Sequence, residues 1–249
     1  MTAMTAMAPP DDPAEQAARA AMRTERDELV ILNELVPLAA QQIIELGCGA
    51  ARTTRRLLLR WPGCRVTGLE VDAIQHARNL EEPAARLRFL QAGAQAIPLP
   101  DASFDLALML KSLHHVPAAL MDQALAEARR VLRTGACLYV SEPVYAGGLN
   151  ELMRLVNDEG VVRAQAQAAL DRAAIRGDWQ RMADLFFDVP VHFADFAQFQ
   201  QRMLNATFVA QRKDADTLEH LQMLFAKHQT GEAAFFTRPM HVTLLRAAG

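Results

Sequence analysis

Short apolar runs alternate with amphipathic segments along the middle of the chain. Five runs have the length and character of strands that are buried on both faces: 42–46, 65–70, 87–91, 105–110 and 136–141. Apolar residues at helical spacings predict helices between some of these strands, near 52–60, 73–81 and 118–133. Strands that alternate with helices indicate right-handed βαβ units and a parallel sheet. The pattern therefore predicts an α/β fold.

The two ends of the chain differ from this middle part. Several prolines among residues 1–13 predict a disordered tail, and leucines at helical spacing predict an N-terminal helix within 14–40. The region 146–249 is mostly helical in pattern, except for a short strand candidate at 189–193 and a last strand at 240–246. We expect this region to return to the sheet and to cover one edge of it as a helical lid. The core is then formed by residues 41–145.

The composition limits the classes of function. The chain is 51% hydrophobic and 22% charged, which is typical of a soluble globular protein, and no apolar run is long enough to span a membrane. A net charge of -3 without a basic stripe argues against a nucleic-acid partner and against an anionic membrane. No secretory signal begins the chain, and three separated cysteines form no CxxC-type zinc site. We therefore expect a cytoplasmic protein that binds no metal ion.

A glycine turn follows the first strand. Gly47 and Gly49 allow the backbone to turn tightly and to approach a ligand at the start of the next helix. Glu70 ends the second strand, where an acidic side chain can hold both ribose hydroxyls of a nucleoside. These features fit an NAD enzyme and an adenosyl-sulfonium enzyme equally well.

Glu45 favours the second class of ligand. Its carboxylate stands just before the first glycine, where it would repel a pyrophosphate and attract an ammonium group such as the methionine end of S-adenosylmethionine (SAM). The third glycine of the dinucleotide fingerprint is also absent, because Ala51 and Arg52 stand in that region. The alternative is that Glu45 is only a hydrogen-bonded carboxylate at the end of a strand.

The segment Glu45-Leu46-Gly47-Cys48-Gly49 resembles the first motif of the class I SAM-dependent methyltransferases. Four later segments resemble further motifs of the small-molecule "type 11" (UbiE-like) branch: 66–72, 97–105, 112–115 and 130–135. The resemblance implies a Rossmann-like fold, with a mostly parallel seven-stranded sheet of order 3-2-1-4-5-7-6 and a helical lid insertion before strand 6. It also implies SAM as the cofactor, S-adenosylhomocysteine (SAH) as the product, and a small-molecule acceptor.

The resemblance assigns cofactor contacts to the glycine turn, the ribose strand, the adenine loop and the end of the fourth strand. These residues are Glu45, Gly47, Cys48, Gly49, Glu70, Val71, Gly93, Ala94, Gln95 and Lys111. For Lys111 we expect the backbone carbonyl to contact the cofactor and the side chain to point away. Gly93 departs from the family, which usually has an aspartate there to accept a hydrogen bond from the adenine amino group. The Ala94 N–H, the Gln95 amide or apolar walls could replace that contact, so we expect weaker rather than lost binding.

Two histidines, His114 and His115, follow the fourth strand at the edge where such sheets bind ligands. An imidazole there can take a proton from the acceptor as the methyl group arrives, and related enzymes favour His115. The alternative is that both histidines only pack locally. Four residues are candidates for the acceptor side: Glu142, Tyr145, His192 and Arg238. Glu142 could instead pair with an arginine.

We predict a methyltransferase that transfers the methyl group of SAM directly to a small molecule. Two alternatives stay open. One is a SAM-binding regulatory or scaffolding protein without turnover, and the other is a methylase of a protein or RNA acceptor.

Overall fold

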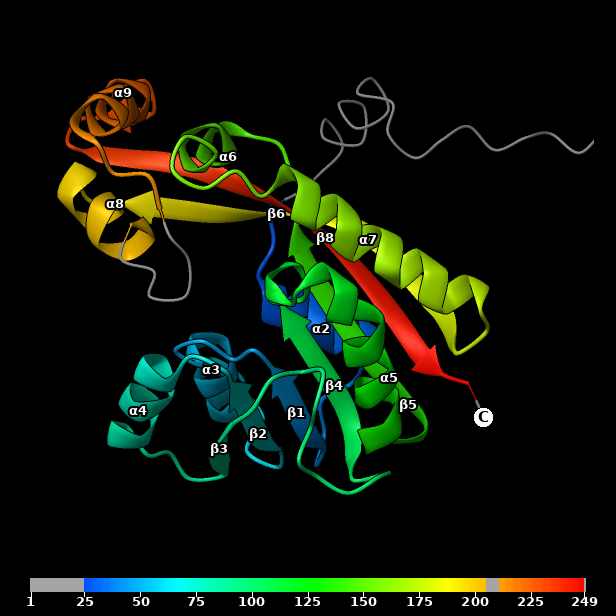
Figure 1. The fold of residues 1–249 in the computed structure, drawn as a ribbon. Coiled ribbons are helices and arrows are strands. Elements are labelled where there is room, and N and C mark those ends of the chain that lie inside the picture. The colour runs from blue at the N-terminus through cyan, green and yellow to red at the C-terminus, as the bar shows by residue number, and fades with distance from the viewer. Residues whose placement is uncertain (1–24, 205–210, 249) are drawn as a thin grey trace, which may run out of the picture.

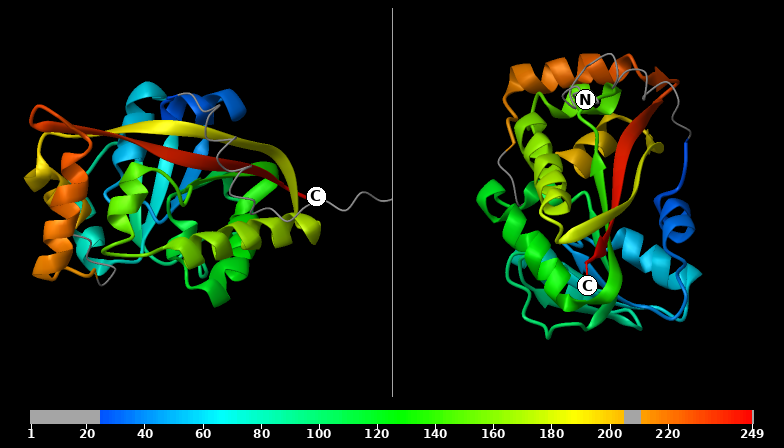
Figure 2. Two further views of the ribbon diagram at one scale, coloured as in Figure 1. Left: turned by 90° about the horizontal axis from the view of Figure 1, so that it is seen from above. Right: turned by 90° about the vertical axis from the view of Figure 1, so that its right-hand side faces the viewer.

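The computed structural model describes residues 25–204 and 211–248, which form one mixed sheet with helices on both faces (Figures 1 and 2). The strand order is β3-β2-β1-β4-β5-β8-β6, and the two-residue strand β7 pairs only with β8. The strands are β1 (Gln42–Leu46), β2 (Arg65–Glu70), β3 (Leu87–Gln91), β4 (Phe104–Leu110), β5 (Leu132–Pro143), β6 (Trp179–Phe193), β7 (Gln229–Thr230) and β8 (Ala233–Ala247). Strands β1 to β5 are parallel, and β8 is antiparallel to both of its main neighbours. The predicted order is confirmed, since β6 and β8 are its sixth and seventh strands.

The helices cover both faces of the sheet, and three of them pack around the outer ends of β6 and β8. The helices are α2 (Glu28–Leu35), α3 (Arg52–Arg60), α4 (Ala73–Glu81), α5 (Met121–Val131), α6 (Gly148–Met153), α7 (Gly160–Ile175), α8 (Phe196–Met203) and α9 (Ala215–Ala226), with short 3-10 turns η1 (Leu113–His115) and η2 (Ala118–Leu120). The expected tail at 1–13 and the first part of the expected N-terminal helix lie outside the described residues. Of the rest of that helix only α2 forms, because Asp27 caps its start and Glu25 forms an isolated bridge with Asp188 instead. None of the described helices is long and apolar enough to cross a membrane.

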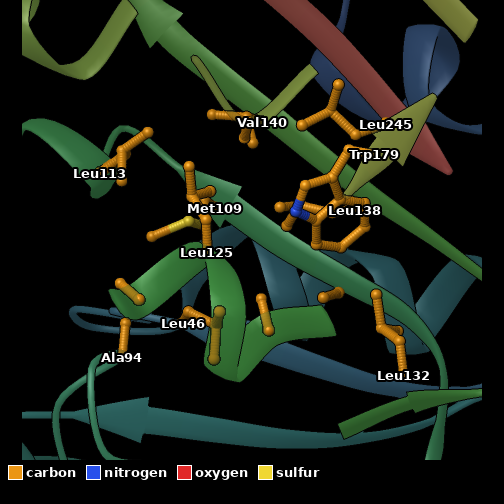
Figure 3. Close-up of a cluster of buried hydrophobic side chains, with 14 of the residues drawn as sticks. Leu46, Ala94, Met109, Leu113, Leu125, Leu132, Leu138, Val140, Trp179 and Leu245 are labelled. Atoms are coloured by element: carbon orange, nitrogen blue, oxygen red, sulfur yellow. The ribbon is translucent and has the colours of Figure 1, made fainter. Parts of the chain in front are cut away.

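Alternating side chains of the buried strands build a separate core on each face of the sheet. Ile44 and Met109 belong to the core beneath α5 and α7, whereas their neighbours Ile43 and Leu108 belong to the core beneath α2 and α3. Figure 3 shows strand residues of the first core beside Leu125 of α5. Burial on both faces explains why the sequence of these strands is continuously apolar. Because β1 and β4 are parallel neighbours, their C-terminal ends lie at the same edge of the sheet.

The last two long strands differ from the prediction. The strand candidates at 189–193 and 240–246 are only parts of β6 and β8, each of which has 15 residues. Helices α6 and α7 precede β6 as expected, but α8 and α9 follow it, so the helical insertion is not confined to the segment before strand 6. β6 pairs with β8 along its whole length, so both strands are longer than any of the strands β1 to β5. Figure 1 shows this hairpin extending past the sheet toward α8 and α9.

Candidate active site

The glycine turn after β1 has the geometry that its sequence predicts. Gly47 and Gly49 have φ of +78° and +51°, in the left-handed region that favours glycine. A Cβ atom on Gly47 would lie 2.8 Å from the Cβ of Ser112, so space as well as backbone conformation requires glycine there. The Gly47 and Cys48 N–H groups both donate to the carbonyl of Leu69 at the end of β2. The turn is therefore tied to the neighbouring strand.

Glu70 is held rigidly beside this turn. Its carboxylate is 7% exposed, and its two oxygens accept the N–H groups of Gly49 and Asp72, both at 2.8 Å. The side chain of Asn79 from α4 donates to the Gly49 carbonyl at 2.7 Å. Each carboxylate oxygen keeps a second lone pair, which can accept a hydrogen bond from a hydroxyl group. The geometry suits a carboxylate that binds two adjacent hydroxyls.

A cavity of about 390 Å³ lies at the C-terminal edge of the sheet. Gly49 and Glu70 line one part of it, and His114, His115 and Arg238 line another. Residues of α6, α7 and α8 complete the wall, and Figure 1 shows α6 and α8 on the side toward which β4 and β5 point. The cavity therefore joins the turn predicted to bind the cofactor to the two histidines.

His114 is buried and fixed by two carboxylates. Its Nδ1 is hydrogen-bonded to Glu142, which also accepts the Leu113 N–H at 2.8 Å. Its Nε2 lies 3.7 Å from a carboxylate oxygen of Glu159. Because a carboxylate can only accept, Glu142 selects the tautomer with the proton on Nδ1. Glu142 therefore is the partner of His114 and does not line the cavity, and the alternative pairing with an arginine does not form within the described part of the chain.

His115 is more exposed and contacts His114, with 4.0 Å between the ring centroids and 45° between the ring planes. Although solvent reaches part of the ring, partial desolvation by the cavity walls lowers the pKa of His115 to about 4, and the neighbouring His114 acts in the same direction. His115 is therefore a neutral imidazole at physiological pH, and it lines the cavity.

His114, His115 and Glu159 are the one group in the described part of the chain that could hold a metal ion, with ligand atoms within 4.8 Å of one another. The same Glu159 oxygen already accepts a hydrogen bond from Nη2 of Arg163 at 2.6 Å. A dication would have to displace or repel this guanidinium, so the arrangement favours an ion pair of Glu159 with Arg163. The expectation that no metal ion binds stays a prediction.

Glu45 and Cys48 are buried at the glycine turn and do not line the cavity. Glu45 is 3% exposed and accepts the hydroxyl of Thr54. Burial raises the pKa of Glu45 to about 7, against the opposing effects of the Thr54 hydrogen bond and the charge of Lys111. Burial likewise raises the pKa of the Cys48 thiol. Lys111 has φ of +59° and lines the cavity, and the expectation that its backbone carbonyl contacts the cofactor stays a prediction.

The adenine loop shows what fills the place of the missing aspartate. A Cβ atom on Gly93 would lie 2.5 Å and 2.6 Å from the amide oxygen and nitrogen of Gln95. The Gln95 amide therefore occupies the space that the side chain of an aspartate at position 93 would need. Ala94 is buried, and Val71 is 65% exposed beside Glu70. Neither residue lines the cavity.

Of the acceptor-side candidates, Arg238 lines the cavity. Tyr145 lies outside it, and its hydroxyl donates to Asp158 at 2.8 Å. His192 also lies outside the cavity and contacts the ring of Phe235. The alternation of β6 places its neighbours Val191 and Phe193 in a buried cluster, which leaves His192 on the exposed face.

Several residues of the cavity wall have no motif that could have predicted them. They come from α6, α7, α8 and the loops between, where the family resemblance gives no guide: Asn150, Met153, Asn157, Glu159, Arg163, Arg202 and Met203. Only their positions in the folded chain bring them to the cavity.

Comparison with known proteins identifies the family. A family model described as a methyltransferase domain matches residues 43–135, which include the glycine turn, Glu70 and both histidines. Residues 43–135 therefore belong to the class I SAM-dependent methyltransferase family. An O-methyltransferase of Pyrenophora dematioidea is 29% identical over 167 residues, which are 65% of this chain and 61% of that protein. A fatty-acid O-methyltransferase of Mycolicibacterium smegmatis is 30% identical over 139 residues, which are 55% of this chain and 49% of that protein.

The chain thus spans less than two thirds of the length of these two relatives. A solved SAM-dependent methyltransferase of Methanosarcina mazei has the same fold, with a TM-score of 0.55 and 14% identity. The superposition covers 90% of this chain and 99% of that chain. The shared fold therefore extends beyond the residues that the family model matches.

Proposed function

We propose that this methyltransferase binds SAM and transfers its methyl group directly to a small-molecule acceptor in the cytoplasm. The observation that carries the proposal is the single cavity that joins Gly49 and Glu70 to His114 and His115. Its volume of about 390 Å³ is in the range of small-molecule sites. The three cysteines are free, as a reducing compartment would leave them.

In this proposal the cofactor lies across the glycine turn. Glu70 accepts hydrogen bonds from both ribose hydroxyls, and the Gln95 amide replaces the usual aspartate at the adenine. The buried Glu45 carboxylate balances the ammonium group of the methionine end, and its pKa of about 7 means that a nearby cation would favour its ionised form.

The transfer itself is an in-line displacement at the methyl carbon. The acceptor atom forms a bond to the methyl carbon while the bond from that carbon to sulfur breaks, and SAH leaves with the electron pair. Because the sulfonium is already an activated electrophile, the protein chiefly aligns the two reactants and excludes water. Alignment of this kind contributes on the order of 7–11 kcal/mol in well-oriented cases.

A proton on the acceptor atom needs a base. His115 is the proposed base, since it lines the cavity and is neutral at physiological pH. Base catalysis of this kind contributes roughly 10²–10⁴-fold. His114 is the second candidate, because Glu142 fixes its tautomer and leaves Nε2 able to accept a proton.

Two observations bear on the alternatives. The named acceptor of a relative, a fatty acid, is a small molecule, and the volume of the cavity beside His115 favours such an acceptor over a protein or RNA. A SAM-binding protein without turnover would need no base, yet both histidines line the cavity together with Glu159.

The test is calorimetric titration of the full chain with SAM, SAH and NADH, followed by transfer of labelled methyl from SAM to a panel of hydroxyl, amine and thiol compounds. We expect SAM and SAH to bind and at least one compound to become labelled. Binding of NADH in place of SAM would overturn the proposal. SAM binding without transfer to any acceptor, including total protein and RNA, would favour the regulatory alternative.

A further inference from the structure

Arg238 on β8 is a cation without a counter-ion. Its guanidinium lines the cavity and makes no hydrogen bond or ion pair with any residue of 25–204 and 211–248. Burial lowers the pKa of Arg238, and the charges of Arg163 and Arg202 act in the same direction. A desolvated charge that is left unpaired is unfavourable for the folded protein. Such a residue is typical of a binding site that awaits an anion.

The two neighbouring arginines of the cavity wall differ from Arg238 in this respect. Arg163 bonds to the carboxylate of Glu159 and to the side chain of Asn150. Arg202 donates to the carbonyl of His192 at 2.8 Å, and its guanidinium lies over a phenylalanine ring. The charge of Glu159 acts on Arg238 in the opposite direction to these two arginines, but Glu159 is paired with Arg163 and makes no ion pair with Arg238.

Three apolar side chains also contribute to this wall, among its polar residues. Leu149 and Met153 of α6 and Met203 of α8 line the same cavity as Arg238. These apolar side chains beside the guanidinium of Arg238 fit an organic anion with an apolar body. A guanidinium binds a carboxylate with two parallel hydrogen bonds.

We propose that Arg238 binds a carboxylate of the methyl acceptor, so that the substrate is a small organic acid with an apolar body. This inference rests on the proposed function, because it assigns the acceptor side of the same cavity. The cofactor has a carboxylate of its own, and Arg238 also lines a second cavity beside Lys111 and Glu28. The experiment must therefore separate binding of the acceptor from binding of the cofactor.

The full chain is first titrated with SAH, and the SAH-loaded protein is then titrated with matched acids and alcohols: benzoate and benzyl alcohol, cinnamate and cinnamyl alcohol, hexanoate and hexanol. We expect at least one acid to bind about tenfold or more tightly than its alcohol, because only the acid pairs with the guanidinium. Arg238→Gln should reduce the affinity for that acid to the level of the alcohol while SAH affinity stays within about twofold.

The control is Arg246→Gln, because Arg246 lies on the same strand, is exposed and does not line the cavity. This variant should change neither affinity. Arg238→Gln should melt no lower than the wild type without ligands, since it removes an unpaired charge.

Three results would overturn the inference. They are a panel in which no acid binds better than its alcohol, an Arg238→Gln variant that binds the acid as the wild type does, and a variant that loses SAH affinity instead. If SAH does not bind to the wild type, the proposed function fails by itself. The same acid and alcohol titrations of the unloaded protein then decide on Arg238 separately.

Discussion

Replacement of Glu70 by alanine is the sharpest test of the cofactor site. The variant removes the acceptor of both ribose hydroxyls, and hydrogen bonds to a charged group are worth about 1.5–3 kcal/mol each. The lower end of this range for two bonds is about 3 kcal/mol, which corresponds to a roughly 100-fold loss of SAH affinity. The variant also frees the N–H groups of Gly49 and Asp72. Because both residues line the cavity, water can reach these groups, and the loss of stability should be small.

The assay is calorimetric titration with SAH at a constant pH, with thermal denaturation measured in parallel. Glu81→Ala is the matched control, since Glu81 is an exposed residue at the end of the adjacent helix α4. Glu70→Gln keeps one acceptor oxygen and should lie between the wild type and Glu70→Ala. If folded Glu70→Ala binds SAH within about twofold of the wild type, Glu70 does not hold the ribose, and the proposed position of the cofactor is wrong.

Three further predictions concern other parts of the molecule. In a Gln95→Ala background, Gly93→Asp should bind SAH a few-fold more tightly in calorimetry than Gln95→Ala alone, because the amide that fills the space of the new side chain is gone. Equal or weaker binding would mean that the protein holds the adenine in another way. His115→Ala should lower the methyl-transfer rate and leave SAH affinity nearly intact. The wild-type rate should rise with pH through about 4, because the imidazole loses its proton there. An unchanged rate and pH profile in the variant would exclude His115 as the base. Tyr139→Phe should lower the free energy of unfolding in urea by about 1–3 kcal/mol, because the buried Glu28 carboxylate loses the hydroxyl that donates to it at 2.6 Å; a change below about 0.5 kcal/mol would show that the buried pair has no net effect.

The first half of the fold could be predicted closely from the sequence. β1, β2 and β3 begin and end at the predicted residues, and so do α3 and α4. These strands are short and buried, and glycine turns or helix caps stand at their ends, so local pattern and tertiary environment agree. The order of the sheet could be predicted as well, although it came from the family resemblance and not from the pattern.

The second half was predicted less well for a physical reason. Trp179–Phe193 includes Arg181, Asp184 and Asp188, whose polar side chains interrupt any simple strand pattern. The segment is a strand because β8 pairs with it along its whole length, and that pairing is a long-range property. The same holds for Glu159 and Arg163, which reach the cavity only through the placement of α7. Motifs could locate the turn, Glu70 and the histidines, but not the wall opposite them.

The position of β8 between β5 and β6 has a consequence for biosynthesis. β6 is made before β8, yet in the described part of the chain β8 is the one strand that pairs with it, apart from a single bridge between Asp188 and Glu25. β6 therefore cannot join the sheet until β8 has left the ribosome. Until then β5 presents an open strand edge, with its backbone groups available to other chains. Translation that stops before residue 233 therefore yields a nascent chain whose parallel half can form while its edge stays exposed, a state prone to aggregation and to capture by chaperones.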